Sequence, residues 1–259
     1  MIQIKTPQEI AIMAEGGKIL AKIMKKLEQA VKPGITTNDL EKIAENLILQ
    51  AGAKSSFKGY RGYKESGGES AEPFPTCLCT SINEQIIHAI PSDRQLKQGD
   101  ILSLDLGLCW KGFHTDMAIT IPVGEISPEA QRLIRTTKKA LKRALKKVRP
   151  GNFFGDTANA IQRHIESQGF SIIRDWCGHG IGKELHEDPE VPNYGKRKTG
   201  PKFVEGMVFC FEPMVAMGSG KTKKAQDGYA YQTADNSLSA HFEHTVAVLK
   251  NGCKVLTII

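Results

Sequence analysis

Four acidic residues lie in apolar segments, where burial of a charged carboxylate would cost free energy. Asp105 falls within the apolar run ILSLDLGLCW and Glu212 within MVFCFEPMV. A second carboxylate follows each on a later alternating segment, Asp116 in GFHTDMAITI and Glu243 in AHFEHTVAVL. Burial of an isolated charge is unfavourable, so each group needs a partner charge or a metal ion. For any single residue, an edge strand facing water or a buried ion pair explains the pattern equally well.

A histidine in a glycine-rich stretch is the next candidate for chemistry. Residues 176–189, WCGHGIGKELHEDP, contain His179 and His186, and three glycines surround the first of them. Glycine permits positive φ and lets a backbone or ligand come close. A surface turn that happens to carry histidines is an equally good explanation of this stretch alone. A dinucleotide-binding G-x-G-x-x-G loop is a weak one, because Lys183 occupies the third glycine position.

An internal duplication indicates which elements must position these residues. Residues 31–52, VKPGITTNDLEKIAENLILQAG, align without gaps with residues 148–169, VRPGNFFGDTANAIQRHIESQG. A lysine-rich amphipathic segment precedes each copy and begins at a helix-capping residue followed by proline, Thr6 in a capping box and Ser127. We therefore expect two helices in each half, with the closing glycine of each copy as a C-terminal cap.

The duplication continues into the segments that carry the carboxylates. Residues 98–107, QGDILSLDLG, match residues 205–214, EGMVFCFEPM, which gives Asp105 and Glu212 equivalent places. Only two copies exist, at a spacing far too long for a solenoid. The sequence predicts an α+β fold in a single catalytic domain, with pseudo-symmetric halves of helices and antiparallel strands around a central cleft, roughly residues 1–125 and 126–259.

The predicted symmetry changes the interpretation of the carboxylates. A two-fold axis brings all four to the same cleft, where edge-strand exposure or ordinary ion pairs no longer explain the set. Like charges packed together cannot all ionise unless a cation compensates them. Together with His179 they offer four oxygen ligands and one nitrogen, which suits two divalent metal ions about 3.5–4 Å apart. We therefore expect a dinuclear metal centre.

Composition narrows the class of protein. The chain has 259 residues, 40% of them hydrophobic, as in a soluble globular protein. Its apolar runs fall short of the ~18 residues of a membrane span, and the start, MIQIKTPQEI, lacks the apolar core of a secretion signal. The six cysteines show no C-x-x-C spacing, which favours reduced thiols in the cytoplasm.

The net charge of +7 comes largely from lysine clusters at residues 138–149 and 195–198. Such runs are most often solvated helix faces or loops. The sharper interpretation is a basic surface that contacts RNA or the ribosome, although no nucleic-acid-binding module accompanies it. The net charge is therefore information about possible binding partners and not about the reaction.

The chain closely resembles the type I methionine aminopeptidases of the pita-bread metallopeptidase family over essentially its whole length. The resemblance is carried by SINEQIIHAIP (81–91), LDLGLCWKGFHTD (104–116), CGHGIGKELHEDP (177–189), FEPM (211–214) and SLSAHFEHT (237–245). It implies a pita-bread fold and removal of the N-terminal methionine from nascent proteins whose second residue is small. It also implies two divalent metal ions per chain (cobalt, manganese, iron or zinc) and a monomer.

The resemblance also implies roles for individual residues. The metal ligands would be Asp105, Asp116, His179, Glu212 and Glu243, with Asp116 and Glu243 bridging the ions. Glu212 would in addition shuttle a proton, while His88 and His186 would contact the substrate and assist the reaction. The pocket for the methionine side chain would draw on Tyr60, Tyr63, Cys79, His88 and Tyr229.

Several positions depart from the family pattern. Ala89 and Leu185 replace a usual glycine and phenylalanine beside the two helper histidines, Cys210 replaces a usual threonine near the metals, and Tyr229 replaces a tryptophan. Residues 64–75, KESGGESAEPFP, read as an inserted surface loop. Two alternatives remain: an Xaa-Pro aminopeptidase or prolidase of the same fold, and a non-catalytic relative that binds ribosomes or RNA.

Overall fold

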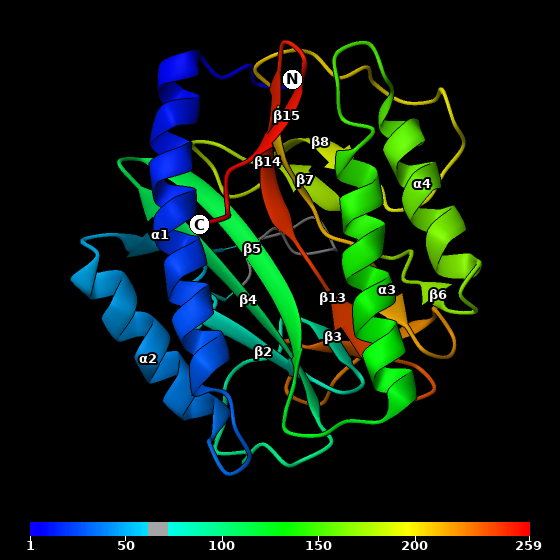
Figure 1. Ribbon diagram of the computed structural model, residues 1–259. Helices are drawn as coiled ribbons and strands as arrows, with labels where there is room; N and C mark the ends of the chain where they lie inside the picture. The colour runs from blue at the N-terminus through cyan, green and yellow to red at the C-terminus, as the bar shows by residue number, and fades with distance from the viewer. Residues whose placement is uncertain (62–71) are drawn as a thin grey trace.

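Two pairs of helices flank the strands of the computed structural model, which describes residues 1–61 and 72–259 (Figure 1). α1 (Pro7–Ala30) and α2 (Thr37–Gln50) lie on the left of the view, and α3 (Pro128–Leu145) and α4 (Phe154–Glu166) on the right. One helix pair in each half is what the duplicated sequence predicts, and this prediction is confirmed.

Two helices of the described chain begin at the caps that the sequence predicts, Thr6 for α1 and Ser127 for α3. The Thr6 hydroxyl accepts a hydrogen bond from the Glu9 amide and the Glu9 carboxylate accepts one from the Thr6 amide, so the capping box forms. Thr36 and Asp39 form a second box at α2, and Ser127 caps α3. α4 differs: Phe153 stands at its cap and offers no side-chain hydrogen bond. The closing glycines adopt φ of +68° at Gly52 and +77° at Gly169, as C-terminal caps require.

The first half is built on one long antiparallel pair. β4 (Ile101–Trp110) pairs along its whole length with β5 (Phe113–Pro122), and β1 (Lys54–Ser55) and β2 (Leu78–Ile82) pair with β4 on its other side. Asp105 faces Ala118 across the β4–β5 ladder and Asp116 faces Gly107. Both carboxylates therefore lie within continuous strands, as predicted.

The second half divides the same pattern into two shorter pairs. β9 (Val208–Phe211) pairs with β14 (His244–Leu249), and β10 (Met214–Ala216) pairs with β13 (Ser239–His241). Glu212 and Glu243 lie in the two breaks, so the expectation that they sit within strands is wrong. The chain changes sheet at both points, and the breaks free Glu243 to donate its amide hydrogen to the Ala118 carbonyl of β5 at 2.8 Å.

The remaining strands complete two small sheets and a larger one. β3 (Gln85–Ile87), β12 (Tyr231–Thr233) and β11 (Thr222–Lys224) form one sheet, and β6 (Ser171–Ile172) adds to β10. The larger sheet runs β15 (Gly252–Val255), β14, β9, β7 (Gly178–Gly180) and β8 (Glu187–Val191). The architecture is α+β, as predicted. The division of a single domain into halves at about residue 125 stays a prediction.

The helices that the structure describes include none with the length and apolar character needed to cross a membrane. The helices instead bury one face against the strands. Leu20, Met24 and Leu27 of α1 are fully buried together with leucines of β4, whereas Leu133 and Ala140 of α3 belong to a second core with Phe209 of β9. Each helix pair thus packs on a separate core, and a third cluster joins apolar residues of both halves.

The capping box at α2 generates a stability prediction. In Thr36→Ala the Asp39 amide loses its side-chain acceptor, the Thr36 hydroxyl, and we expect the free energy of unfolding to fall by about 1 kcal/mol. Thr36→Ser keeps the hydroxyl and should retain most of that stability. Urea denaturation of the two variants checks this, and equal losses in both would assign the effect to the methyl group of threonine.

Candidate metal centre

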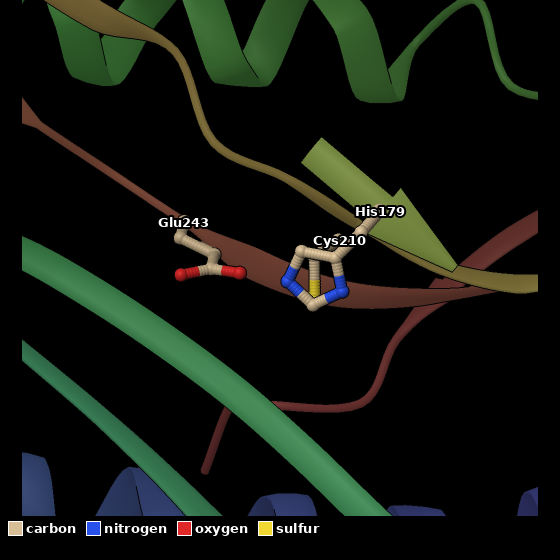
Figure 2. Close-up of side chains that lie close together, drawn as sticks. All are labelled: His179, Cys210 and Glu243. Atoms are coloured by element: carbon tan, nitrogen blue, oxygen red, sulfur yellow. The ribbon is translucent and has the colours of Figure 1, made fainter. Parts of the chain in front are cut away.

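The five side chains predicted as ligands come together between the two halves. Carboxylate oxygens of Asp105, Asp116 and Glu243 all lie within 4.8 Å of one another, and Glu243 belongs equally to a group with His179 and Cys210. Figure 2 shows this second group, with the Glu243 carboxylate and the His179 ring coming from different segments of the chain. Glu212 joins the cluster through Oε1, which lies 3.7 Å from His179 Nε2.

The cluster concentrates negative charge away from water. Asp105, Asp116 and Glu243 are 8%, 4% and 2% exposed. Burial raises the pKa of Asp116 to about 7, and burial followed by the charge of Asp116 raises the pKa of the other carboxyls well above their usual range. Among the described residues, the only ion-pair neighbours of these carboxylates within 4.0 Å are imidazoles. Protein cations therefore do not neutralise the cluster.

Two oxygens of the cluster also lack hydrogen-bond partners. Asp105 Oδ1 and Glu243 Oε1 are buried and accept no hydrogen bond from the part of the chain that is described. A buried, unpartnered carboxylate oxygen carries a large desolvation penalty unless a cation contacts it. The donor set of four carboxylates and an imidazole is one that divalent transition metals accept. The residues present thus fit the metal ions that the sequence predicts.

His179 is held in the tautomer that can bind a metal. Its Nδ1 lies 2.9 Å from the Gly180 carbonyl oxygen. Because a carbonyl only accepts, Nδ1 carries the hydrogen and Nε2 keeps its lone pair, directed toward Glu212. Burial lowers the pKa of His179 to about 4, so the ring is neutral at physiological pH. A neutral imidazole with one nitrogen fixed by a carbonyl is typical of a metal ligand.

The glycines around His179 serve close packing rather than backbone conformation. Neither Gly178 nor Gly180 has a positive φ. A methyl group on Gly178 would collide with the Cys210 carbonyl oxygen, and one on Gly180 with the Asp188 carbonyl oxygen. Of the two reasons for glycine that the sequence left open, the approach of neighbouring backbone is therefore the one that applies.

The two histidines expected to assist the reaction have different neighbours. The His186 ring stands 4.4 Å from that of His179, and its Nδ1 lies 2.7 Å from the Tyr60 hydroxyl. His88 packs instead against Trp176, with ring centroids 5.7 Å apart, and has an uncommon φ of +61°. Burial lowers the pKa of His186 to about 3 and that of His88 to about 4. Both rings are therefore neutral at physiological pH.

The predicted methionine pocket is brought together in part. Cys79 belongs to one buried apolar cluster, and the partly buried Tyr60 and Phe74 pack against it. Tyr229 packs edge-on against Phe74 with centroids 5.8 Å apart, and the Phe74 amide donates to the Tyr60 carbonyl at 2.9 Å. Tyr63 and most of the predicted insertion at 64–75 lie outside the described residues.

His241 is the clearest candidate that the sequence analysis missed. The residue is 1% exposed, neither of its ring nitrogens has a hydrogen-bond partner among the described residues, and Nε2 lies 3.7 Å from Glu212 Oε2. Glu212 thus stands between the imidazoles of His179 and His241. The sequence does contain one indication of this role: His241 lies two residues before Glu243, and alternate residues of an extended segment share a face.

Aromatic residues form a second group that the sequence analysis did not select. Trp176 and Tyr231 pack against each other with centroids 4.5 Å apart, and both contact His88.

Cys210, expected only to lie near the metals, has its sulfur within 4.8 Å of His179 and Glu243. Burial and then the charge of Glu243 raise the pKa of the Cys210 thiol well above its usual value.

Comparison with known proteins agrees with this geometry. Residues 11–250 match the model of metallopeptidase family M24. A methionine aminopeptidase of Clostridium perfringens is 48% identical over 259 residues, which is all of both chains. Methionine aminopeptidase 1 of Bacillus subtilis is 42% identical, with 99% of each chain covered. The crystal structure of methionine aminopeptidase from Thermotoga maritima superposes with a TM-score of 0.93 at 38% identity and covers 100% of both chains.

The chain therefore belongs to metallopeptidase family M24, and within it to the methionine aminopeptidases. The fold is the pita-bread fold of that family, and the protein is a metal-dependent exopeptidase. This outcome confirms the resemblance drawn from the sequence motifs. It favours the methionine-specific enzyme over the Xaa-Pro peptidase and over a relative without catalytic activity.

The packing around Gly178 generates a prediction about His179. We expect Gly178→Ala to lower the free energy of unfolding by ~1–3 kcal/mol and to weaken metal binding, because the added methyl group pushes β7 away from the Cys210 backbone. In Gly182→Ala the new group meets side chains of Lys5 and Glu187 instead, so its effect should be smaller. Chemical denaturation and metal titration check both, and unchanged metal affinity in Gly178→Ala would contradict the packing argument.

The buried charge of Asp116 generates a prediction about pH. The folded-state pKa of about 7 exceeds the unfolded value near 3.9, so the ionised group costs stability increasingly as pH rises between these values. In metal-free protein we expect Asp116→Asn to be more stable than the wild type at pH 8, by at least ~1 kcal/mol or ~2–4 °C in Tm.

The difference should vanish below about pH 3, where the carboxyl is protonated in both the folded and the unfolded state. With a divalent metal bound the order should reverse, because the variant loses a charged ligand. Thermal denaturation with a chelator and with metal measures all three conditions. A wild type that stays more stable than Asp116→Asn in chelator at pH 8 would show that Asp116 is compensated by the protein itself.

Proposed function

We propose that this methionine aminopeptidase binds two divalent ions in the cluster and removes the N-terminal methionine of nascent proteins whose second residue is small. The observation that carries the proposal is the shared position of Glu243, which belongs both to the group with Asp105 and Asp116 and to the group with His179. One carboxylate common to two ligand groups is what a pair of adjacent ions requires.

The proposed ligands divide between the halves of the molecule. Asp105 and Asp116 of β4 and β5 would hold the ions together with His179, Glu212 and Glu243 of the second half. The sequence resemblance implies that Asp116 and Glu243 would be the ligands shared by both ions. Cobalt, manganese, iron and zinc all accept such a set, and availability decides among them. Divalent ions bound here would act as Lewis acids. They would also lower the pKa of a bound water molecule to about 7.

Side chains of this protein carry the proton in the proposed reaction. Glu212 is buried beside two neutral imidazoles, and its raised pKa suits it to accept a proton from the attacking water and pass it to the departing amine. His186, whose ring is oriented by Tyr60, would hydrogen-bond the substrate carbonyl oxygen. His88 would contact the amide nitrogen that is released.

Substrate binding follows from the same surroundings. The buried carboxylates favour a positively charged or metal-coordinated α-amino group, which restricts the enzyme to chain termini. The apolar cluster with Tyr60, Cys79 and Phe74 offers aromatic and sulfur groups to a thioether, contacts worth about 0.3–1.5 kcal/mol each. We include Tyr63, Tyr229 and His88 in this pocket on the strength of the sequence resemblance.

The cellular setting is also proposed. An enzyme acting on nascent N-termini works where proteins are made, in the cytoplasm, and its basic surface would contact the ribosome. We propose that it acts as a monomer. All six cysteines are free thiols in the structure, in agreement with the reduced state expected from their spacing.

The proposed specificity is tested with a panel of Met-Xaa-Ser peptides. Small second residues such as Gly, Ala, Ser, Thr, Pro, Val and Cys should be cleaved with high kcat/KM. Larger ones such as Leu or Lys should be slower by ~10²-fold, because a displacement of about 1 Å at the scissile bond has that effect. Cleavage of Met-Leu as fast as Met-Ala, or preference for Xaa-Pro peptides without methionine, would refute the proposal.

The two histidines of the glycine-rich stretch should differ in role. We expect His179→Ala to lose metal affinity, since it removes the Nε2 ligand. His186→Ala should retain metal and lower kcat, by up to the ~10²–10⁴-fold typical of a lost proton-transfer or hydrogen-bonding group. Metal content measured on both purified variants distinguishes the roles, and equal loss of metal would make His186 a ligand.

A further inference from the structure

A groove of about 730 Å³ lies between α3 and α4, apart from the metal centre. None of the residues that line it belongs to the carboxylate cluster or to the proposed pocket. Seven of the lining residues are lysine or arginine, and one, Asp156, is acidic. The groove therefore concentrates positive charge that the aminopeptidase reaction does not use.

The cations come from three separate segments. Lys139 and Arg143 lie one turn apart on α3, and Lys147 follows in the turn after the helix ends at Leu145; these three residues form a basic stripe along the groove. Across the groove, α4 presents the small or polar Asn159 and Ala160, which leaves the space open. The two lysine clusters noted in the sequence, 138–149 and 195–198, thus meet at one surface.

These cations lack acidic partners. In the described parts of the chain, Arg197 is the only one of the seven with a carboxylate within 4.0 Å, at 3.9 Å from Asp156 Oδ1. That carboxylate is itself occupied, because its oxygens accept the backbone amides of Phe153 and Lys198. All seven cationic residues are exposed. The charge is therefore available to a partner.

A buried histidine in the groove points to a specific ligand chemistry. His164 is 7% exposed, and its Nε2 is buried without a hydrogen-bond partner among the described residues. Burial lowers its pKa, and the charges of Arg143 and Lys139 lower it further. An anion lying over the stripe would offset these charges and offer an acceptor to a protonated ring nitrogen.

We infer that this groove binds the phosphodiester backbone of structured RNA. Arginines are prominent among its cations, Arg143, Arg149, Arg163 and Arg197, and the guanidinium group matches phosphate geometry with two parallel hydrogen bonds. Seven cationic residues from separate segments offer contacts to several phosphates rather than one. The proposed function explains only why the enzyme would meet RNA. The binding itself is independent of it, because peptide cleavage needs none of these residues.

The composition of the groove favours RNA over an acidic protein. Protein–protein interfaces have apolar, aromatic-rich centres and are depleted of lysine. Here Phe153 and Ala160 are the apolar lining residues within the described chain, and the rest are charged or hydrogen-bonding groups. Nucleic-acid interfaces are polar and strongly positive. Contacts of this kind read the shape and phosphates of an A-form helix, not its sequence.

The test measures binding of a fluorescent RNA duplex of about 20 base pairs by anisotropy. The groove variant is Lys139→Gln/Arg143→Gln/Lys147→Gln. Its matched control is Lys18→Gln/Lys22→Gln/Lys26→Gln, which removes the same charge at the same spacing from the exposed face of α1. We expect the groove variant to bind ~10-fold or more weakly, and its slope of log K against log salt to fall by about 3, one for each lost phosphate contact.

The control should stay within ~2-fold of the wild type and keep most of its salt slope. Both variants should cleave Met-Ala-Ser at the wild-type rate, which shows that they are folded and separates this inference from the proposed function. In the wild type, imidazole resonances of His164 should shift on addition of RNA while those of His114 do not. Equal weakening in both variants, no shift at His164, or tighter binding of a polyglutamate peptide than of RNA would each overturn the inference.

Discussion

The structure depends on the mutual repulsion of carboxylates that are kept away from water. Asp105, Asp116, Glu212 and Glu243 share one buried region in which the described protein supplies imidazoles but no lysine or arginine at ion-pair distance. Removal of such groups from water costs several kcal/mol each unless the charges are compensated. The fold must therefore hold them in place by other contacts until cations compensate them.

Those other contacts come from the joining of the two halves. The Thr245 hydroxyl accepts the Asp116 amide at 2.8 Å and donates to the Asp116 carbonyl at 2.9 Å, and the Glu243 amide donates to the Ala118 carbonyl at 2.8 Å. Within the second half, the Asn193 side-chain amide donates to the Glu212 carbonyl at 3.1 Å. Each bond fixes the backbone of a proposed ligand, so the second half positions the carboxylates of the first.

The molecule separates its two kinds of charge by burial. The anionic groups lie inside, where low dielectric makes their attraction for a metal strong, whereas the cations of the α3–α4 groove lie on the surface, where salt screens them. The buried centre therefore suits a tightly held ion and the groove suits a reversible, salt-dependent partner. This separation explains how a chain of net charge +7 can keep an acidic active centre.

The sequence by itself determined the helices, the duplication and the identity of the five proposed ligands. Capping residues, closing glycines and apolar periodicity act locally, and four acidic residues in apolar segments are informative without coordinates. The tertiary structure decided what depends on distance. Glu212 and Glu243 lie at breaks where the chain changes sheet, His241 faces Glu212, and two lysine clusters meet in one groove. These features arise from contacts between residues far apart in the chain, which local patterns do not encode.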